Sequence, residues 1–429
     1  MFGKTIKIKN RDFLFFAFII LSIFVACNEY TSILCFMVFL CVSVLVFIFA
    51  RNLESIAFYF LLIAINSAVG KIAIPRTTVT ITALIYVFFF LLMVYEIYKG
   101  KKISPLFSLL ILLWLITRII THYINGRSII EVCWRSIVIC IGVAVFMLVQ
   151  NNKKNSGFLL KCICFTGYAS CLLGCVEMLL GKTFFYSRWT GQERYRFGVI
   201  RAGSFFEDPN YLSLFLVPLF FLLFTETFRK TIGMMQVNVL MALIVFCVAF
   251  SGSRSGIISL ILGICLYYFL KYRKILIILV PGIFVVIYFS QFLIDDIMNA
   301  DLSSTSTRLR IIEVAIEYWK KNVIWGNGIN SFYNDSKSLI GTQYQTINTY
   351  VNILVDFGVV GFGYYVVLFV CEIRYAMKCF SAQYRRDSII LIVSIISWII
   401  MAFTLDTYTT IMYLIFPAVI NSMSQLSEE

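Results

Sequence analysis

Apolar stretches of about 20 residues recur along nearly the whole chain and are separated by short polar segments. A stretch of this length crosses the hydrocarbon core of a bilayer as one helix. The pattern therefore predicts an all-α, polytopic integral membrane protein with about 14 transmembrane helices. The expected spans are 13–29, 31–50, 55–72, 77–97, 105–122, 131–149, 157–180, 209–225, 233–250, 254–271, 274–294, 346–373, 388–404 and 408–424.

The composition excludes a soluble protein. Of the 429 residues 61% are hydrophobic and only 14% are charged, whereas a soluble domain carries roughly a quarter charged residues. We expect residues 1–429 to form a single transmembrane domain with two long periplasmic loops, 181–210 and 295–345. Neither loop contains any of the 13 cysteines, and the sequence has one histidine. This argues against a disulfide framework and against a histidine-based metal site.

Lysine and arginine predict the orientation, because they are enriched in cytoplasmic loops. With the N-terminus inside, more than half of the 36 basic residues fall on the cytoplasmic side. Short loops on the other face, such as 28–30 and 405–407, contain none. Both termini are therefore expected in the cytoplasm.

Three segments predicted to lie outside are basic in spite of this rule: 182–201, the turn at Arg254, and 308–337. Long loops are translocated regardless of charge, so the topology stands. One interpretation is a solvated basic surface that touches anionic lipid headgroups. The other is an anionic substrate held at the outer membrane surface, since the planar guanidinium group binds phosphate bidentately.

The first of these segments leads into a predicted helix. Asp208 followed by Pro209 is a typical helix start, which places the positive end of a helix dipole beside Arg201. Glu207 is the best-placed carboxylate for acid–base chemistry, with Glu193 and Asp208 as rivals, although Glu207 fits equally well as a helix-start acid. Further candidate substrate-binding residues here are Arg194, Arg196 and Asn210.

The second segment, 251–256, reads Ser-Gly-Ser-Arg-Ser-Gly and joins two predicted spans at the outer face. Small residues allow a tight turn, and Arg254 stands at the start of an inward-running helix. The arginine either extends toward the membrane surface or, with its serines, binds phosphate. The composition of the turn favours phosphate binding.

The third segment is the loop 295–345. Residues 308–321 read as a helix, with Leu309, Ile312, Ile316 and Trp319 on one face. An amphipathic helix on the membrane surface is expected, with Arg308 and Arg310 among its polar positions. A Gly-x-Gly turn at 326–328 follows, and Asn348 precedes the next span, in which Gly358 and Gly361 allow close packing or a bend.

In this order and spacing, the three segments resemble the O-antigen ligase and polymerase superfamily. That family has an Arg-x-Gly-x-Phe…Pro-Asn segment, a Ser-Arg-Ser/Gly turn, a Ser-x-Arg pair, a Gly-x-Gly turn and His-Asn-x-x-Leu…Gly-x-x-Gly. The matching residues are Arg201, Gly203, Phe205, Pro209 and Asn210; Ser253, Arg254 and Ser255; Ser306 and Arg308; Gly326 and Gly328; and Asn348, Gly358 and Gly361.

One departure separates this chain from the ligases. The histidine that precedes the asparagine in that motif is Ile347 here. The resemblance assigns that histidine a part in activating the acceptor hydroxyl of ligases. The chain is therefore more similar to the polymerase branch, Wzy, whose members vary at this position. The expected number of about 14 spans also fits polymerases better than ligases.

The resemblance implies a metal-independent glycosyltransferase of the GT-C type that uses no cofactor and binds no nucleic acid. It would join oligosaccharide units carried on undecaprenyl diphosphate, at the outer face of the bacterial inner membrane and in contact with membrane lipid. Arg201, Arg254 and Arg308 would meet the charge on the leaving diphosphate, and Glu207 would serve as the base. Arg194, Arg196, Asn210, Arg310 and Asn348 would bind substrate, and a chain-length regulator (Wzz) is a candidate partner.

Two alternatives remain. A ligase of the same superfamily is the nearer one, weakened by Ile347. A flippase for lipid-linked oligosaccharides also has many spans and basic residues. It should carry its charges along a central cavity between two similar halves. The sequence shows no internal repeat, and its outer basic residues gather in loops.

Overall fold

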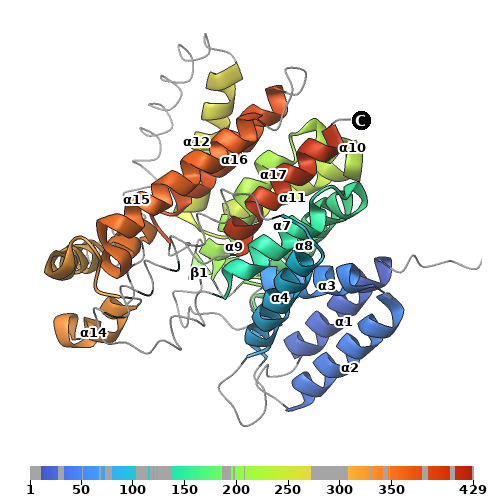
Figure 1. Ribbon diagram of the computed structural model, residues 1–429, viewed down its shortest axis with the longest axis horizontal. Helices are drawn as coiled ribbons and strands as arrows, with labels where there is room; N and C mark the ends of the chain where they lie inside the picture. Colours follow the sequence, from blue (N-terminus) through green and yellow to red (C-terminus); the bar gives the residue numbers. More distant parts are fainter. Residues whose placement is uncertain are drawn as a thin grey trace, which may run out of the picture. The chain divides into compact units, whose positions relative to one another are not determined.

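The structure is a computed structural model. It describes residues 11–27, 33–50, 52–66, 69–72, 80–102, 115, 119, 123, 137–185, 195–196, 199–206, 208–271, 308–328, 330–341, 346, 348–378, 385–405 and 411–427. The predicted all-α architecture is confirmed for this part of the chain (Figure 1). One small exception is an antiparallel pair of strands, β1 (Tyr195–Arg196) and β2 (Val199–Ile200), in which Tyr195 pairs with Ile200.

The helices follow one another with short connections wherever the intervening residues are described. They are α1 (Asp12–Cys27), α2 (Ile33–Ala50), α3 (Leu53–Ile65), η1 (Val69–Lys71), α4 (Ile81–Tyr98), α7 (Ile139–Val149), α8 (Lys153–Leu180), α9 (Pro209–Leu222), α10 (Glu226–Ile232), α11 (Met234–Phe250), α12 (Arg254–Lys271), η4 (Lys320–Asn322), α14 (Ser331–Ile340), α15 (Thr349–Lys378), α16 (Arg385–Met401) and α17 (Ile411–Ser427). Residues 308–319 are also helical.

Five of the described helices, α2, α4, α8, α12 and α15, are long and apolar enough to cross a membrane. The number rises to six if the bent pair α9 and α10 forms one span. The chain is thus a multi-pass membrane protein, and these helices overlap the spans expected at 31–50, 77–97, 157–180, 254–271 and 346–373. The count of about 14 stays a prediction; the expected span 274–294, for example, lies outside the described residues.

Two of the expected spans are interrupted at a polar residue. In place of 55–72, α3 ends at Ile65, where the side chain of Asn66 donates to the carbonyl of Leu62 at 2.7 Å. In place of 209–225, α9 ends at Leu222 and α10 continues at an angle of 96°. Thr225 produces this bend because its hydroxyl accepts from the backbone N–H of Phe228 and caps α10. The apolar composition of a stretch alone does not predict these interruptions by single polar residues.

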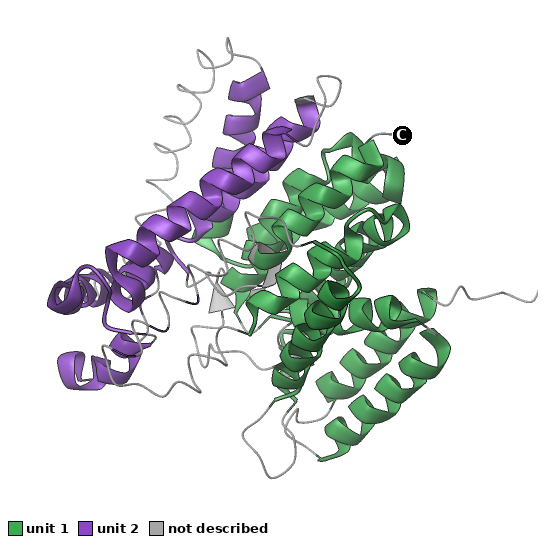
Figure 2. Ribbon diagram, viewed as in Figure 1, with its two compact units in different colours: residues 1–103, 137–256, 414–429 green, residues 104–136, 257–413 purple. Residues whose placement is uncertain are grey.

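The described residues fall into two compact units (Figure 2). Unit 1 comprises residues 1–103, 137–256 and 414–429, and unit 2 comprises 104–136 and 257–413. In unit 1, α1 packs against α2, α4 against α7, and α8 against α9 and α11. In unit 2, α15 packs against α14 and α16. The single transmembrane domain expected for 1–429 stays a prediction.

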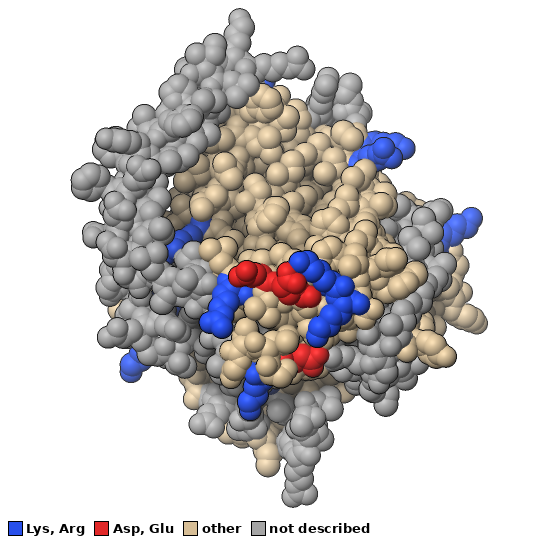
Figure 3. Space-filling view, turned by 90° about the vertical axis from the view of Figure 1, so that its left-hand side faces the viewer, with Lys and Arg blue, Asp and Glu red and all other residues tan. Residues whose placement is uncertain are grey.

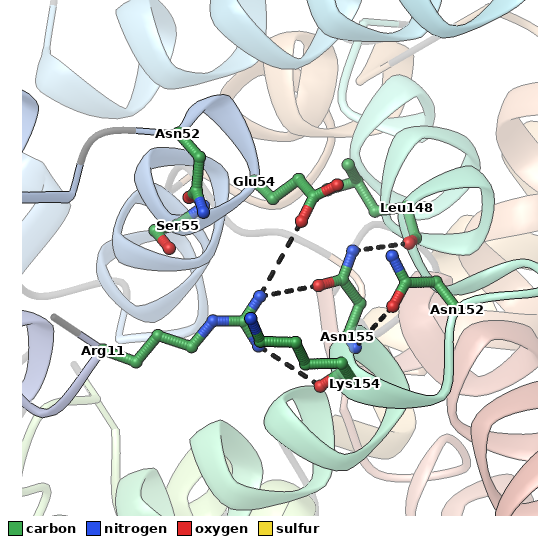
Figure 4. Close-up of polar contacts among 8 residues, drawn as sticks. All are labelled: Arg11, Asn52, Glu54, Ser55, Leu148, Asn152, Lys154 and Asn155. Atoms are coloured by element: carbon green, nitrogen blue, oxygen red, sulfur yellow. Dashed lines mark hydrogen bonds and ion pairs between the residues drawn. The ribbon is translucent and has the colours of Figure 1, made fainter. Parts of the chain in front are cut away.

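A polar cluster ties several helix ends of unit 1 together around Arg11 (Figure 4). The Arg11 guanidinium donates to Asn155 Oδ1 at 2.7 Å and to the Lys154 carbonyl at 3.2 Å, and lies 3.7 Å from a Glu54 carboxylate oxygen. Asn155 in turn donates to the Leu148 carbonyl near the end of α7. The cluster joins the beginnings of α1, α3 and α8 to the end of α7. All four of these ends are expected on the cytoplasmic side.

Candidate functional site

The predicted helix start at Asp208 is confirmed. Asp208 is the N-cap of α9 and Pro209 occupies the first turn. Asp208 Oδ1 accepts from both the backbone N–H and the side-chain amide of Asn210, each at 2.7 Å. Because Nδ2 of Asn210 is bound to Asp208, its Oδ1 is turned toward Arg201.

Arg201 is held by two different helix ends of unit 1. Its Nε donates to the carbonyl of Ser251 at 3.1 Å, and its Nη2 lies 3.5 Å from Asn210 Oδ1. Ser251 is the C-cap of α11, where the carbonyl end of the helix dipole favours a cation. The guanidinium is therefore fixed between the end of α11 and the start of α9, and it remains partly exposed.

Serines build the turn that leads to Arg254. Ser251 Oγ accepts from the backbone N–H of Ser253, and Ser253 Oγ accepts from that of Gly256, which caps the start of α12. Gly256 is required at its position, because a Cβ there would lie 2.7 Å from the Cβ of Ser213. The prediction that Arg254 begins a helix is confirmed, since α12 starts at this residue.

These contacts assemble one site in unit 1 from segments that lie about 50 residues apart. The two helix starts of α9 and α12 carry Asn210 and Arg254, and Arg201 is bonded to both segments. Backbone N–H groups at a helix N-terminus and a nearby guanidinium both attract negative charge. The arrangement is suited to binding an anion such as a phosphate.

Several predicted site residues lie outside the described part of the chain. Glu207, its rival Glu193 and Arg194 are among them, and the side chain of Arg196 is not described. Their roles stay predictions. Asp208, the third candidate base, is 7% exposed and serves as the α9 cap through Oδ1.

Unit 2 contains the other basic segment. Arg308 is partly exposed and Arg310 exposed at the start of the described helix 308–319. Figure 3 shows charges of both signs gathered on the face that includes this helix and α14. Glu317 and Lys320 form one exposed ion pair there. The surface is therefore mixed in sign rather than uniformly basic.

The face of the helix 308–319 that packs into unit 2 differs from the predicted stripe. Ile311, Ala315 and Tyr318 are buried against Phe332 and Val355. In the predicted stripe, by contrast, Leu309 is 62% and Ile316 37% exposed. The helix thus has a buried apolar face and, beside it, an exposed one. The sequence pattern identified only the second, because the first is defined by packing against Phe332 and Val355, which lie far along the chain.

The Gly-x-Gly turn and the glycines of α15 are interlocked. Gly326 and Gly328 have φ of 76° and 89°, and Gly358 interrupts α15 with φ 65° and ψ −165°. The backbone N–H groups of Asn327 and Gly328 donate to the carbonyls of Val355 and Asp356 at 2.7 and 3.0 Å. Of the two alternatives expected for Gly358 and Gly361, close packing or a bend, the structure shows a break at Gly358, and the turn satisfies carbonyls that this break exposes.

Asn348 caps α15. Its Oδ1 accepts from the backbone N–H groups of Tyr350 and Val351, and its amide donates to the carbonyl of Phe403. The structure thus gives it a structural role at the helix start, and its expected part in substrate binding stays a prediction.

Glu177 was not among the predicted site residues. It lies in the last turn of α8, is 1% exposed, and accepts hydrogen bonds from the backbone of the loop that carries Arg201. The only signal in the sequence is an acid within an apolar span. This signal does not reveal which backbone groups the carboxylate meets.

Part of the chain matches a known protein family. Residues 239–366 match the family described as O-antigen ligase. The match includes Arg254, Arg308, Asn348 and the glycines of α15. Arg201 and Asn210 precede its first residue and lie outside it. The predicted resemblance to the O-antigen ligase and polymerase superfamily is confirmed. A comparison with curated proteins found no match.

Proposed function

We propose that this chain polymerises oligosaccharide repeat units linked to undecaprenyl diphosphate, at the outer face of the bacterial inner membrane. The observation that carries the proposal is the fixed guanidinium of Arg201 beside two helix starts, α9 and α12, the second of them headed by Arg254. The family match over residues 239–366 supports chemistry on lipid-linked polysaccharide.

In the proposed reaction, a hydroxyl at the non-reducing end of an incoming unit attacks the anomeric carbon of the growing chain. A new glycosidic bond forms, the bond from that carbon to the diphosphate oxygen breaks, and undecaprenyl diphosphate leaves. The hydroxyl proton passes to a base, for which Glu207 is the candidate. Arg201 and Arg254 stabilise the charge that develops on the leaving diphosphate.

Cations can take this role without a metal, because they are in place before the reaction and need no reorganisation. Arg201 is preorganised in this sense: its Nε is bound to Ser251 and its Nη2 lies near Asn210. Arg308, as a third charge-stabilising cation, stays a candidate from the sequence, as does the GT-C type. Further candidate binding residues are Arg194, Arg196, Asn210, Arg310 and Asn348.

Exposed apolar side chains in the basic segment of unit 2 support a lipid-linked substrate. The exposed apolar face of the helix 308–319 continues into Val323, Ile324 and Trp325, which are 40%, 60% and 37% exposed. The exposed charged residues Arg310, Glu313 and Glu317 lie on the adjoining side of the helix. An apolar face beside a charged one fits a helix that lies in the membrane surface. The membrane-surface helix expected from the sequence stays a proposal, which this distribution of side chains supports.

A ligase is the second candidate, favoured by the description of the matched family. A ligase transfers the finished polysaccharide to a lipid core acceptor and thus also releases undecaprenyl diphosphate. Ile347 occupies the position at which the ligases of the superfamily have their histidine. Isoleucine has no group that exchanges a proton, which favours the polymerase.

Deletion of the gene tests the proposal. The surface polysaccharide of the deletion strain, separated on a gel, should consist of cores capped with single units. Loss of all attachment to the core would indicate a ligase instead. Accumulation of lipid-linked units inside the cell, with none exposed outside, would reject both in favour of a flippase.

A further inference from the structure

We infer that Glu177 is a positioning residue that orients Arg201 by closing the base of the loop 181–206. This inference rests on the proposed function, in which Arg201 binds the leaving diphosphate. Glu177 lies in α8, four residues before Gly181, which ends the helix in a left-handed conformation with φ 63°. Its carboxylate is directed at backbone groups on both sides of the loop.

The two carboxylate oxygens bind the two ends of the loop. Oε1 accepts from the backbone N–H of Phe184 at 3.0 Å, and Oε2 accepts from that of Ser204 at 2.8 Å. The main-chain carbonyl of Glu177 also accepts from the N–H groups of Gly181 and Lys182. One residue thus fixes the helix end, the first residues of the loop and the last.

Ser204 needs such a partner. It is 1% exposed and has φ 53°, a left-handed conformation that is unfavourable for a residue with a side chain. The ring of the next residue, Phe205, lies 5.3 Å from that of Phe185, which closes the same base by apolar contact. Arg201 is only three residues before Ser204. By holding Ser204, the carboxylate therefore restricts the position of the Arg201 backbone.

No other side chain can accept both hydrogen bonds that the Glu177 carboxylate accepts. In Glu177→Gln one oxygen becomes an NH₂ group, which faces a backbone N–H donor and loses that hydrogen bond. Glu177→Asp keeps the charge, but its side chain is one methylene shorter and cannot reach both amides. Glu226→Gln is the matched control, because Glu226 is exposed and pairs with Lys230 on α10.

The test measures backbone hydrogen exchange and polymerisation in the full-length protein in lipid nanodiscs. For Glu177→Gln we expect exchange at Phe184 and Ser204 to rise about tenfold or more, with the middle of α8 unchanged. The KM for the lipid-linked repeat unit should rise about tenfold and kcat should fall less, because binding geometry is lost before chemistry. Glu177→Asp should fall between wild type and Glu177→Gln, and Glu226→Gln should match wild type.

Parallel measurements on Arg201→Ala separate this inference from the proposed function. If Arg201→Ala lacks activity while Glu177→Gln shows normal exchange and normal KM, the positioning role is wrong and the proposed site stands. Raised exchange along the whole of α8 would also contradict the positioning role. If exchange rises only at the loop base and Arg201→Ala polymerises normally, the proposed diphosphate site is wrong, and with it the link between Glu177 and activity.

Discussion

Arg201 and Arg254 are held in two different ways. Arg201 reaches from a loop to the C-terminal carbonyl of α11, whereas Arg254 is part of a helix start. The sequence predicted both as anion-binding residues from their neighbours, and it predicted the Asp208 cap. It did not predict the bond from Arg201 to Ser251, because that contact joins residues 50 positions apart and no local pattern encodes it.

Substitution of Arg201 tests its role at the residue scale. Arg201→Ala should reduce the polymerisation rate about 100-fold, the effect typical of removing one charge-stabilising donor. Arg201→Lys should recover only part of it, since an ammonium group lacks the planar fork that bonds Ser251 through Nε and still offers further N–H groups to a phosphate. Rates are measured with purified protein and lipid-linked units.

The control for this series is Lys230→Ala, which removes an exposed cation paired with Glu226. It should leave the rate unchanged. Normal polymerisation by both Arg201 variants would contradict the diphosphate site.

At the scale of elements, apolar length and cap residues predicted the long helices well. The start of α12 at Arg254 and the end of α8 at Leu180 agree with the expected spans 254–271 and 157–180. The bend after Leu222 and the end of α3 at Ile65 were not predicted, because single polar side chains, Thr225 and Asn66, decide them. The buried face of the helix 308–319 was missed because it depends on packing against α14 and α15.

The break in α15 provides a sharp prediction for an element. An added Cβ at Gly358 would lie 2.2 Å from the carbonyl oxygen of Ile324, and the backbone there is open only to glycine. Gly358→Ala should therefore lower the free energy of unfolding by roughly 3 kcal/mol or more. Thermal unfolding in detergent, followed by circular dichroism, measures the loss.

Gly363→Ala is the matched control on the same helix. An added Cβ at this position meets nothing within 4 Å, so alanine should be neutral or stabilise the helix by roughly 0.5–1 kcal/mol. Equal effects of the two substitutions would contradict the interlocked turn.

At the scale of the whole molecule, the sequence predicted a membrane protein and a resemblance to the superfamily, and both are confirmed. The number of spans depends on segments outside the described residues. The orientation of the chain can be defined only relative to a membrane. The Arg11 cluster shows that the beginnings of α1, α3 and α8 and the end of α7 meet in unit 1 (Figure 4). This is the arrangement that regular alternation of spans requires.

Topology reporters test the predicted orientation. Alkaline phosphatase is active only outside the cytoplasm, so fusions after Gln150 and Gly100 should be inactive and a fusion after Asn334 should be active. A green fluorescent protein series at the same three positions should give the opposite pattern. Active phosphatase after Gln150 would reverse the orientation and place the Arg201 site on the wrong face for the proposed reaction.

The most direct measurement of the central claim is polymerisation by the purified protein alone. Lipid-linked repeat units are supplied in nanodiscs with EDTA, and both the polymer and the released undecaprenyl diphosphate are quantified. The account predicts a ladder of polymer and one released lipid diphosphate for each new linkage, with both lost in Arg201→Ala. Absence of polymer from active, folded protein, with transfer occurring only when a lipid core acceptor is added, would contradict it.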